Sequence, residues 1–225
     1  MAPVILQGFF IFNLYHCKME LTFKQRWGVV WQQQAFRNRF VLGFVVLLLL
    51  LPTLPLFFGH IEKREGYQLN DVVLAHLPSI NLSIPIFTII WTMAVYTVWR
   101  CVQQPKIFLL FLWAFILLNV CRIISISLTP LNAPIGLIEL KDPISNTFYG
   151  SRFITKDLFF SGHTATQFMM FLCLPSKTDK VLTFLSSLAI AAMVLVQHVH
   201  YTLDVVMAFV FAFPIVWLAK KIAAV

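Results

Sequence analysis

Charged side chains are scarce in this sequence. Asp, Glu, Lys and Arg make up 12% of the 225 residues, whereas a soluble domain carries about 25%. The apolar residues form 60% of the chain, and they stand in long blocks instead of at scattered core positions. Composition therefore argues against a soluble fold and predicts an integral membrane protein.

Several familiar motifs are also missing. The four cysteines form no C-x-x-C pair and their spacing fits no zinc site, so we expect neither a disulfide framework, nor a metal site, nor a cofactor. The net charge is +8, but the basic residues flank apolar blocks and no nucleic-acid motif is present, so we expect no nucleic-acid partner. The N-terminus lacks the basic region of a secretory signal, so the internal spans are expected to do the targeting.

The apolar blocks predict an all-α polytopic membrane protein with six transmembrane helices and an N-terminal interfacial helix. Residues 1–39 are expected to be a cytoplasmic amphipathic segment, and residues 40–225 a six-helix transmembrane catalytic domain. The predicted spans are 40–58, 82–99, 107–128, 159–174, 181–199 and 201–219.

The N-terminal segment predicts a helix on the membrane surface. Phe23, Trp27, Val30 and Trp31 follow helical spacing among basic residues, a pattern typical of an anionic interface. A mobile basic tail is the alternative. The apolar run 3–14 is too short to span, since a span needs about 20 residues.

The basic residues predict the orientation. If both termini are cytoplasmic, most of the 17 Lys and Arg residues lie on the cytoplasmic side, as the positive-inside rule requires. Arg122, His163 and His200 then all fall near the non-cytoplasmic face. Three residues far apart in sequence thus share one membrane level, as an active site requires.

His200 and Asp204 are four residues apart, so on a helix they share a face. A carboxylate bonded to one ring nitrogen raises the basicity of the other, which can then attack phosphorus. A pair that only joins two helices is the alternative, although ionisable groups inside a membrane are functional by default.

Ser161, Gly162 and His163 open the predicted fourth span. A helix N-terminus suits a phosphate, and Gly162 permits close backbone approach. His163 is positioned to protonate a leaving alkoxide and then deprotonate an incoming alcohol. The two segments together indicate a divided nucleophile and acid/base site.

Two motifs carry a family resemblance. The segments Phe159-Phe160-Ser161-Gly162-His163-Thr164 and His200-Tyr201-Thr202-Leu203-Asp204-Val205 resemble the catalytic motifs of the sphingomyelin synthase family, a branch of the lipid phosphate phosphatase (type 2 phosphatidic acid phosphatase) superfamily. Plant phosphatidylcholine:diacylglycerol cholinephosphotransferases share these pieces. Further positions that fit the family are Arg122, Asp157 and His198.

The resemblance implies a role for each motif residue. His200 would be the nucleophile, oriented by Asp204, and His163 the general acid and base. Substrate phosphate contacts are expected from Arg122, Ser161, Gly162, Asp157, His198 and Tyr201. An alternative role for Arg122 is that of a residue at the end of a span whose side chain snorkels to the membrane surface and contacts no substrate.

The chain also departs from the phosphatase branch. It lacks a Lys-x6-Arg-Pro motif, and Met193 and Val194 occupy the places of a Ser-Arg pair. Fewer cations suit a zwitterionic diester better than a dianionic monoester.

The function predicted is transfer of a phosphocholine or phosphoethanolamine headgroup. The donor is a glycerophospholipid and the acceptor a lipid alcohol, ceramide or diacylglycerol, and the reaction passes through a phosphohistidine-type intermediate. One alternative is a lipid phosphatase or phospholipase C-like hydrolase that uses the same histidines. The other is a catalytically silent lipid-binding membrane protein.

Overall fold

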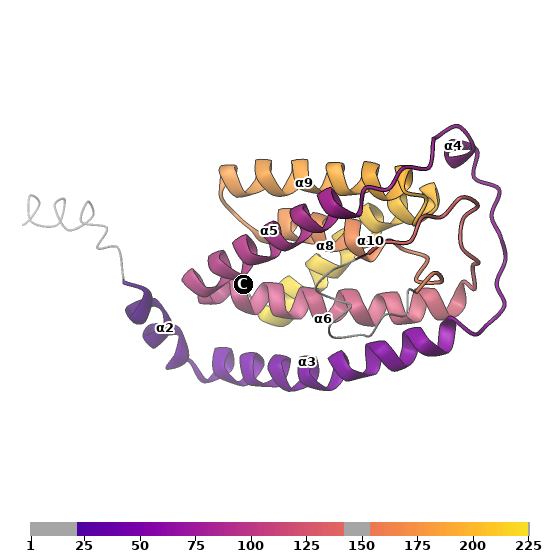
Figure 1. The fold of residues 1–225 in the computed structure, drawn as a ribbon. Coiled ribbons are helices and arrows are strands. Elements are labelled where there is room, and N and C mark those ends of the chain that lie inside the picture. Colours follow the sequence, from indigo (N-terminus) through magenta and orange to yellow (C-terminus); the bar gives the residue numbers. More distant parts are fainter. Residues whose placement is uncertain (1–21, 142–153, 225) are drawn as a thin grey trace, which may run out of the picture.

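The computed structural model describes residues 22–141 and 154–224, and their regular structure is helical. An isolated bridge between Tyr67 and Leu131 is the one strand-like pairing within these ranges. The all-helical prediction is therefore confirmed. The helices are α2 (Phe23–Trp31), α3 (Gln34–Ile61), α4 (Val72–Ala75), α5 (Ser83–Gln103), α6 (Pro105–Leu128), α8 (Gly162–Cys173), α9 (Lys177–Val196) and α10 (Thr202–Ala223) (Figure 1).

Five of these helices, α3, α5, α6, α9 and α10, are long and apolar enough to cross a membrane. They establish a polytopic helical membrane protein. The fourth predicted span, 159–174, differs from expectation because its helix, α8, has only 12 residues. At 1.5 Å per residue it covers about 18 Å, less than the roughly 30 Å of a bilayer core.

Residues 158–161, just before α8, lie in the bundle as non-helical backbone, at the position where the predicted span had further helix. Leu158, Phe160 and Ser161 are fully or almost fully buried. The hydroxyl of Ser125 on α6 donates to the carbonyl of Phe159 at 2.9 Å, and the amide of Ser161 donates to the carbonyl of Asp204 at 3.1 Å. Non-helical backbone is tolerated at membrane depth where it is buried in protein, and these bonds meet that condition.

Helix α6 lies at the centre of the bundle and packs against α3, α5, α8 and α10. Small residues permit close approach along its contacts with α8 and α10. Ala114, Ala165 and Ala208, one from each helix, are completely buried. Helix α3 runs along the outside (Figure 1), and its exposed leucines, such as Leu49 and Leu56, suit contact with lipid tails.

The predicted amphipathic helix is present as α2, and it is docked on the bundle. The indole of Trp27 packs edge-on against the rings of Phe36, Phe40 and Phe108, and its Nε1 donates to the carbonyl of Val102 at 2.7 Å. The next helix, α3, begins at Gln34, earlier than the predicted start of the span at residue 40, because the helix already forms in the mostly polar residues 34–39 that precede the apolar run. The apolar run 3–14 lies outside the described residues.

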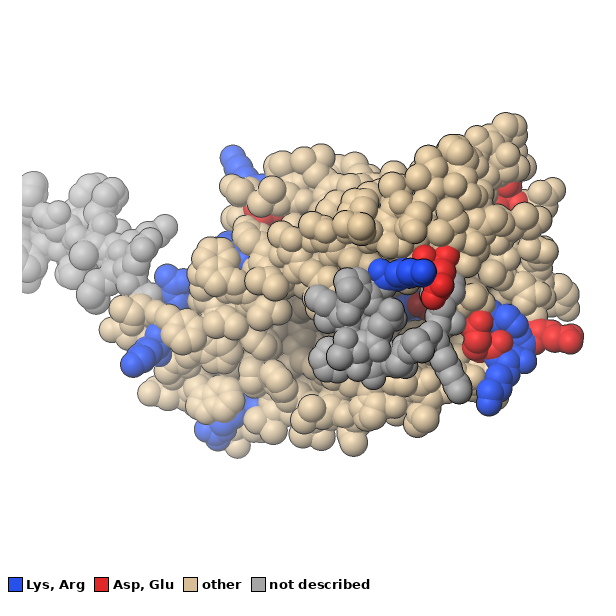
Figure 2. All heavy atoms as spheres, viewed as in Figure 1, with Lys and Arg blue, Asp and Glu red and all other residues tan. Residues whose placement is uncertain are grey.

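We use the term site end for the end of the bundle where residues 62–82, 129–141 and 197–201 connect the helices. On the face shown in Figure 2, basic side chains lie toward the left end, acidic and basic side chains lie together on the right half, and uncharged surface extends along the upper and lower edges between them. This distribution is the one that a membrane-spanning bundle requires.

Candidate active site

Helix α8 begins at the site end with an N-cap. Ser161 is completely buried, and its hydroxyl oxygen accepts from the amide of Thr164 at 3.4 Å. Gly162 and His163 form the first turn of the helix, where the helix dipole is positive and favours an anion.

Arg122 on α6 points at this first turn. Its guanidinium lies so close to Gly162 that a Cβ added there would overlap it, so the position tolerates only glycine without a shift. The Arg122 Nε donates to the carbonyl of Phe160 at 3.4 Å, and the guanidinium forms an ion pair with Asp157. Arg122 is 9% exposed, so its charge lies inside the bundle beside the start of α8.

His200 and Asp204 meet at the start of α10. Nδ1 of His200 lies 3.4 Å from Oδ2 of Asp204, slightly beyond the usual hydrogen-bond length. Oδ2 also accepts from the amide of Tyr201 at 3.1 Å. Within the described part of the chain, neither His200 Nδ1 nor Asp204 Oδ1 has a hydrogen-bond partner. Catalytic hydrogen bonds are often long without substrate and tighten when it binds.

The two histidines face each other across the start of α8. The ring centroids of His163 and His200 are 6.2 Å apart. The ring of Phe87 on α5 stands edge-on to His163 at 6.3 Å and closes the site on that side. His200 is 2% exposed and Asp204 is completely buried, so both groups are shielded from bulk water.

Asp157 and Tyr201 take positions that the resemblance did not indicate. Asp157 pairs with Arg122, so its carboxylate is placed to orient the guanidinium, and its predicted phosphate contact stays a prediction. The Tyr201 hydroxyl donates to the carbonyl of Asn132 at 2.9 Å and accepts from the amide of Leu69 at 3.3 Å. Tyr201 therefore joins two loops at the site end, and its predicted phosphate contact stays a prediction.

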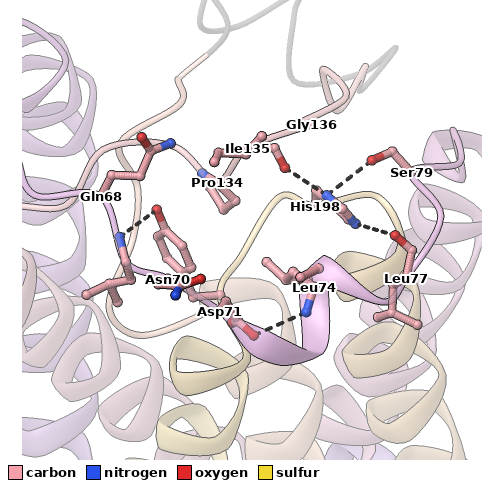
Figure 3. Close-up of a pocket in the computed structure, with 13 residues that line it drawn as sticks. Gln68, Asn70, Asp71, Leu74, Leu77, Ser79, Pro134, Ile135, Gly136 and His198 are labelled. Carbon is pink, nitrogen blue, oxygen red and sulfur yellow. Dashed lines mark hydrogen bonds between the residues drawn. The ribbon is translucent and has the colours of Figure 1, made fainter.

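His198 is buried, at 6% exposed, and lies at the wall of a pocket of about 540 Å³ that Asp71, Ser79, Ile135 and Tyr201 also line (Figure 3). Its ring nitrogens lie near carbonyl oxygens of the surrounding loops. The phosphate contact expected for His198 stays a prediction.

Two supporting residues, Phe87 and Ser125, escaped the sequence interpretation. Phe87 and Ser125 lie in apolar runs and carry no local signal. Asp71 does precede a short helix, which is an N-cap pattern, but it also accepts from the amide of Thr202 at 2.6 Å. It therefore caps α10 across a long stretch of sequence, a contact that only folding reveals.

Within residues 22–141 and 154–224, no group of three or more His, Cys, Asp or Glu side chains is placed to hold a metal ion. The groups gathered at the site are imidazoles, a carboxylate, a guanidinium and a helix N-terminus. Such a set can bind a phosphoryl group, attack it and move a proton.

Comparison with known proteins gives one family. Residues 156–221 match the family model described as PAP2 superfamily C-terminal. No curated protein and no solved structure matches the chain. The matched segment contains His163, His200 and Asp204 and covers 66 of the 225 residues, and over that segment the chain is similar to the PAP2 superfamily.

Proposed function

We propose that this protein transfers a phosphocholine or phosphoethanolamine headgroup from a glycerophospholipid to a lipid alcohol, either ceramide or diacylglycerol. The observation that carries the proposal is the arrangement of His163 and His200, 6.2 Å apart, beside the Arg122 guanidinium at the start of α8. By the positive-inside rule, both termini are cytoplasmic and this site opens toward the non-cytoplasmic face.

In the first step, Nε2 of His200 attacks the phosphorus of the donor. Nδ1 faces Asp204, which leaves Nε2 as the attacking atom. The bond between phosphorus and the diacylglycerol oxygen breaks, and His163 supplies the proton to that oxygen.

In the second step, the acceptor alcohol gives its proton to His163 and its oxygen attacks phosphorus. The N–P bond breaks and His200 returns to its starting state. Arg122 and the N-terminus of α8 stabilise the charge on the phosphoryl oxygens in both steps. No further reactant is required, because the donor and the acceptor supply every atom.

The charge at the site favours a diester donor. Arg122 is already paired with Asp157, so the pair as a whole is neutral. A diester carries one negative charge on its phosphate, whereas a monoester at neutral pH carries up to two. The burial of His200 and Asp204 favours a lipid alcohol over water as the acceptor.

A hydrolase that uses the same side chains is the rival function, and the PAP2 match favours it at the level of the superfamily. Purified protein in vesicles of phosphatidylcholine and phosphatidylethanolamine, supplied with fluorescent ceramide or diacylglycerol, separates the two. A new phosphorylated lipid supports the transferase. Release of phosphate or a free phosphorylated headgroup without a new lipid supports the hydrolase.

Two variants test the residue roles. We expect His200→Ala to abolish turnover and Asp204→Asn to lower kcat by about 10²-fold or more, because the amide cannot stabilise an imidazolium. The exposed His60 on α3 provides a matched control, and His60→Ala should be as active as the wild type. Full turnover by a folded His200→Ala variant would contradict the mechanism.

A further inference from the structure

His200 lies in a non-helical turn, residues 197–201, between α9 and α10. Two residues before it, His198 adopts a φ of 55°, in the left-handed region. Few residues other than glycine adopt this conformation, although histidine and asparagine do so more often than most. The backbone that presents His200 therefore depends on contacts that hold an unfavourable conformation in place.

The imidazole of His198 supplies such contacts. Its Nδ1 lies 2.9 Å from the carbonyl oxygen of Ile135 and 3.1 Å from the hydroxyl of Ser79. Its Nε2 lies 3.2 Å from the carbonyl oxygen of Leu77. Figure 3 shows the ring between these groups. One side chain thus joins the turn that carries His200 to the loop after α6 and to the segment that leads into α5.

Gly136 shows how closely this arrangement is fitted. Its φ is +81°, and a Cβ added there would lie 2.8 Å from the Ser79 hydroxyl and 3.0 Å from Nδ1 of His198. His198 itself is 6% exposed. The three segments are therefore packed around the ring, and any larger residue at position 136 would push them apart.

We infer that His198 is a positioning residue: it ties the turn before α10 to two neighbouring loops and so sets where His200 stands relative to His163. The inference rests on the proposed function for its kinetic consequence. It differs from the phosphate contact that the family resemblance implied, because protein oxygens already surround both ring nitrogens.

The reaction is sensitive to this placement. His200 must stay beside Asp204 while its other nitrogen reaches phosphorus, and an error of about 1 Å in such a geometry costs roughly 10²-fold in rate. The rest of the turn remains attached without His198, since Gln197 also bonds to the loop at Ile138 and Glu139. Loss of the ring should therefore lower kcat while the fold and KM persist.

Variants at position 198 separate the backbone from the side chain. His198→Gly keeps the left-handed backbone but removes all three ring contacts. His198→Asn tolerates the same backbone and retains one polar arm. We expect His198→Gly to lower kcat about tenfold or more with KM changed less than about twofold, and His198→Asn to recover part of the loss.

His76 provides the matched control on the same side of the molecule. It is exposed, and its Nδ1 lies 2.7 Å from the carbonyl of Val72 in its own short helix, so His76→Gln should leave both constants unchanged. Gly136→Ala leaves His198 in place but pushes its imidazole from its position, so this variant should reproduce the kcat loss. A rise in KM with kcat intact in His198→Gly would mean that His198 binds substrate, and wild-type kinetics in that variant would overturn the inference.

Hydrogen–deuterium exchange gives a readout that needs no turnover. Amides in residues 197–203 and 135–139 should exchange faster in His198→Gly than in the wild type or in His76→Gln. Unchanged exchange in both segments would overturn the inference. An inactive wild type with faster exchange in the variant would instead count against the proposed function alone.

Discussion

The guanidinium of Arg122 lies against Gly162, with no space between them for a methyl group. The contact joins the middle of the chain to the first turn of α8 and places a positive charge beside the positive end of a helix. Such a pairing of like charges is stable when an anion lies between or beside them. In the described structure Asp157 supplies that anion. We propose that a substrate phosphate also contacts the Arg122 guanidinium.

Gly162→Ala tests the contact. The new methyl group must displace the guanidinium, so we expect kcat/KM to fall about 10²-fold and the unfolding free energy to fall by about 1–3 kcal/mol. Gly59→Ala on α3 is the control, because a Cβ there meets nothing within 4 Å and alanine favours a helix. Equal activity of Gly162→Ala and wild type would show that Arg122 has no part in the reaction at this position.

A double-mutant cycle separates the two roles of Arg122. Arg122→Gln leaves the Asp157 carboxylate without its partner and should cost about 1–3 kcal/mol of stability together with most of the activity. Adding Asp157→Asn removes the unpaired charge, so stability should recover while activity stays low. Recovery of activity in the double variant would assign Arg122 a purely structural role. Thermal unfolding in detergent and initial rates measure the two effects.

Asp71 predicts a pH dependence of stability. Burial raises the pKa of its carboxyl, but hydrogen bonds from Thr202, Leu74 and Val73 outweigh burial and lower the pKa below its ordinary value of 3.8. A group with a lowered pKa in the folded state stabilises the fold above its ordinary pKa and loses that effect as the pH falls through the lowered value.

The comparison is between wild type and Asp71→Asn. Their difference in unfolding free energy should be constant near neutral pH and shrink as the pH falls below 3.8. A difference that stays the same throughout an acid titration would show that the ionised carboxylate contributes nothing. Because Asp71 caps the helix that carries Asp204, a parallel loss of activity in Asp71→Asn is expected.

Asp179 predicts a loss of stability that leaves substrate binding unchanged. It is 1% exposed and accepts from Arg100 Nη2 at 2.8 Å and from the Tyr96 hydroxyl at 2.5 Å, at the end of the bundle opposite the site. Asp179→Asn removes one charge of a largely buried pair and should cost about 3–5 kcal/mol, with KM unchanged. The exposed Glu65 serves as a control, and Glu65→Gln should unfold like the wild type.

Local sequence was sufficient for much of the fold. Apolar runs identified the long helices because a bilayer demands an uninterrupted apolar stretch. They could not determine where α8 begins, since residues 158–160 are equally apolar and this segment is held in a non-helical form by bonds to Ser125 and Asp204.

The contacts of the candidate site are also of two kinds: some follow from local sequence spacing and others only from the tertiary fold. The four-residue spacing of His200 and Asp204 is enough to bring their side chains together, because a helix repeats every 3.6 residues. The pairing of Arg122 with Asp157, the loop contacts of His198 and the cap that Asp71 places on α10 depend on contacts between segments far apart in sequence.

Sequence by itself thus determined the membrane class, the main helices and the residues that carry the proposed chemistry. Only the tertiary structure decided which of the accompanying residues face the phosphate site and which hold the loops, because a polar side chain takes whichever partner folding brings within hydrogen-bond distance.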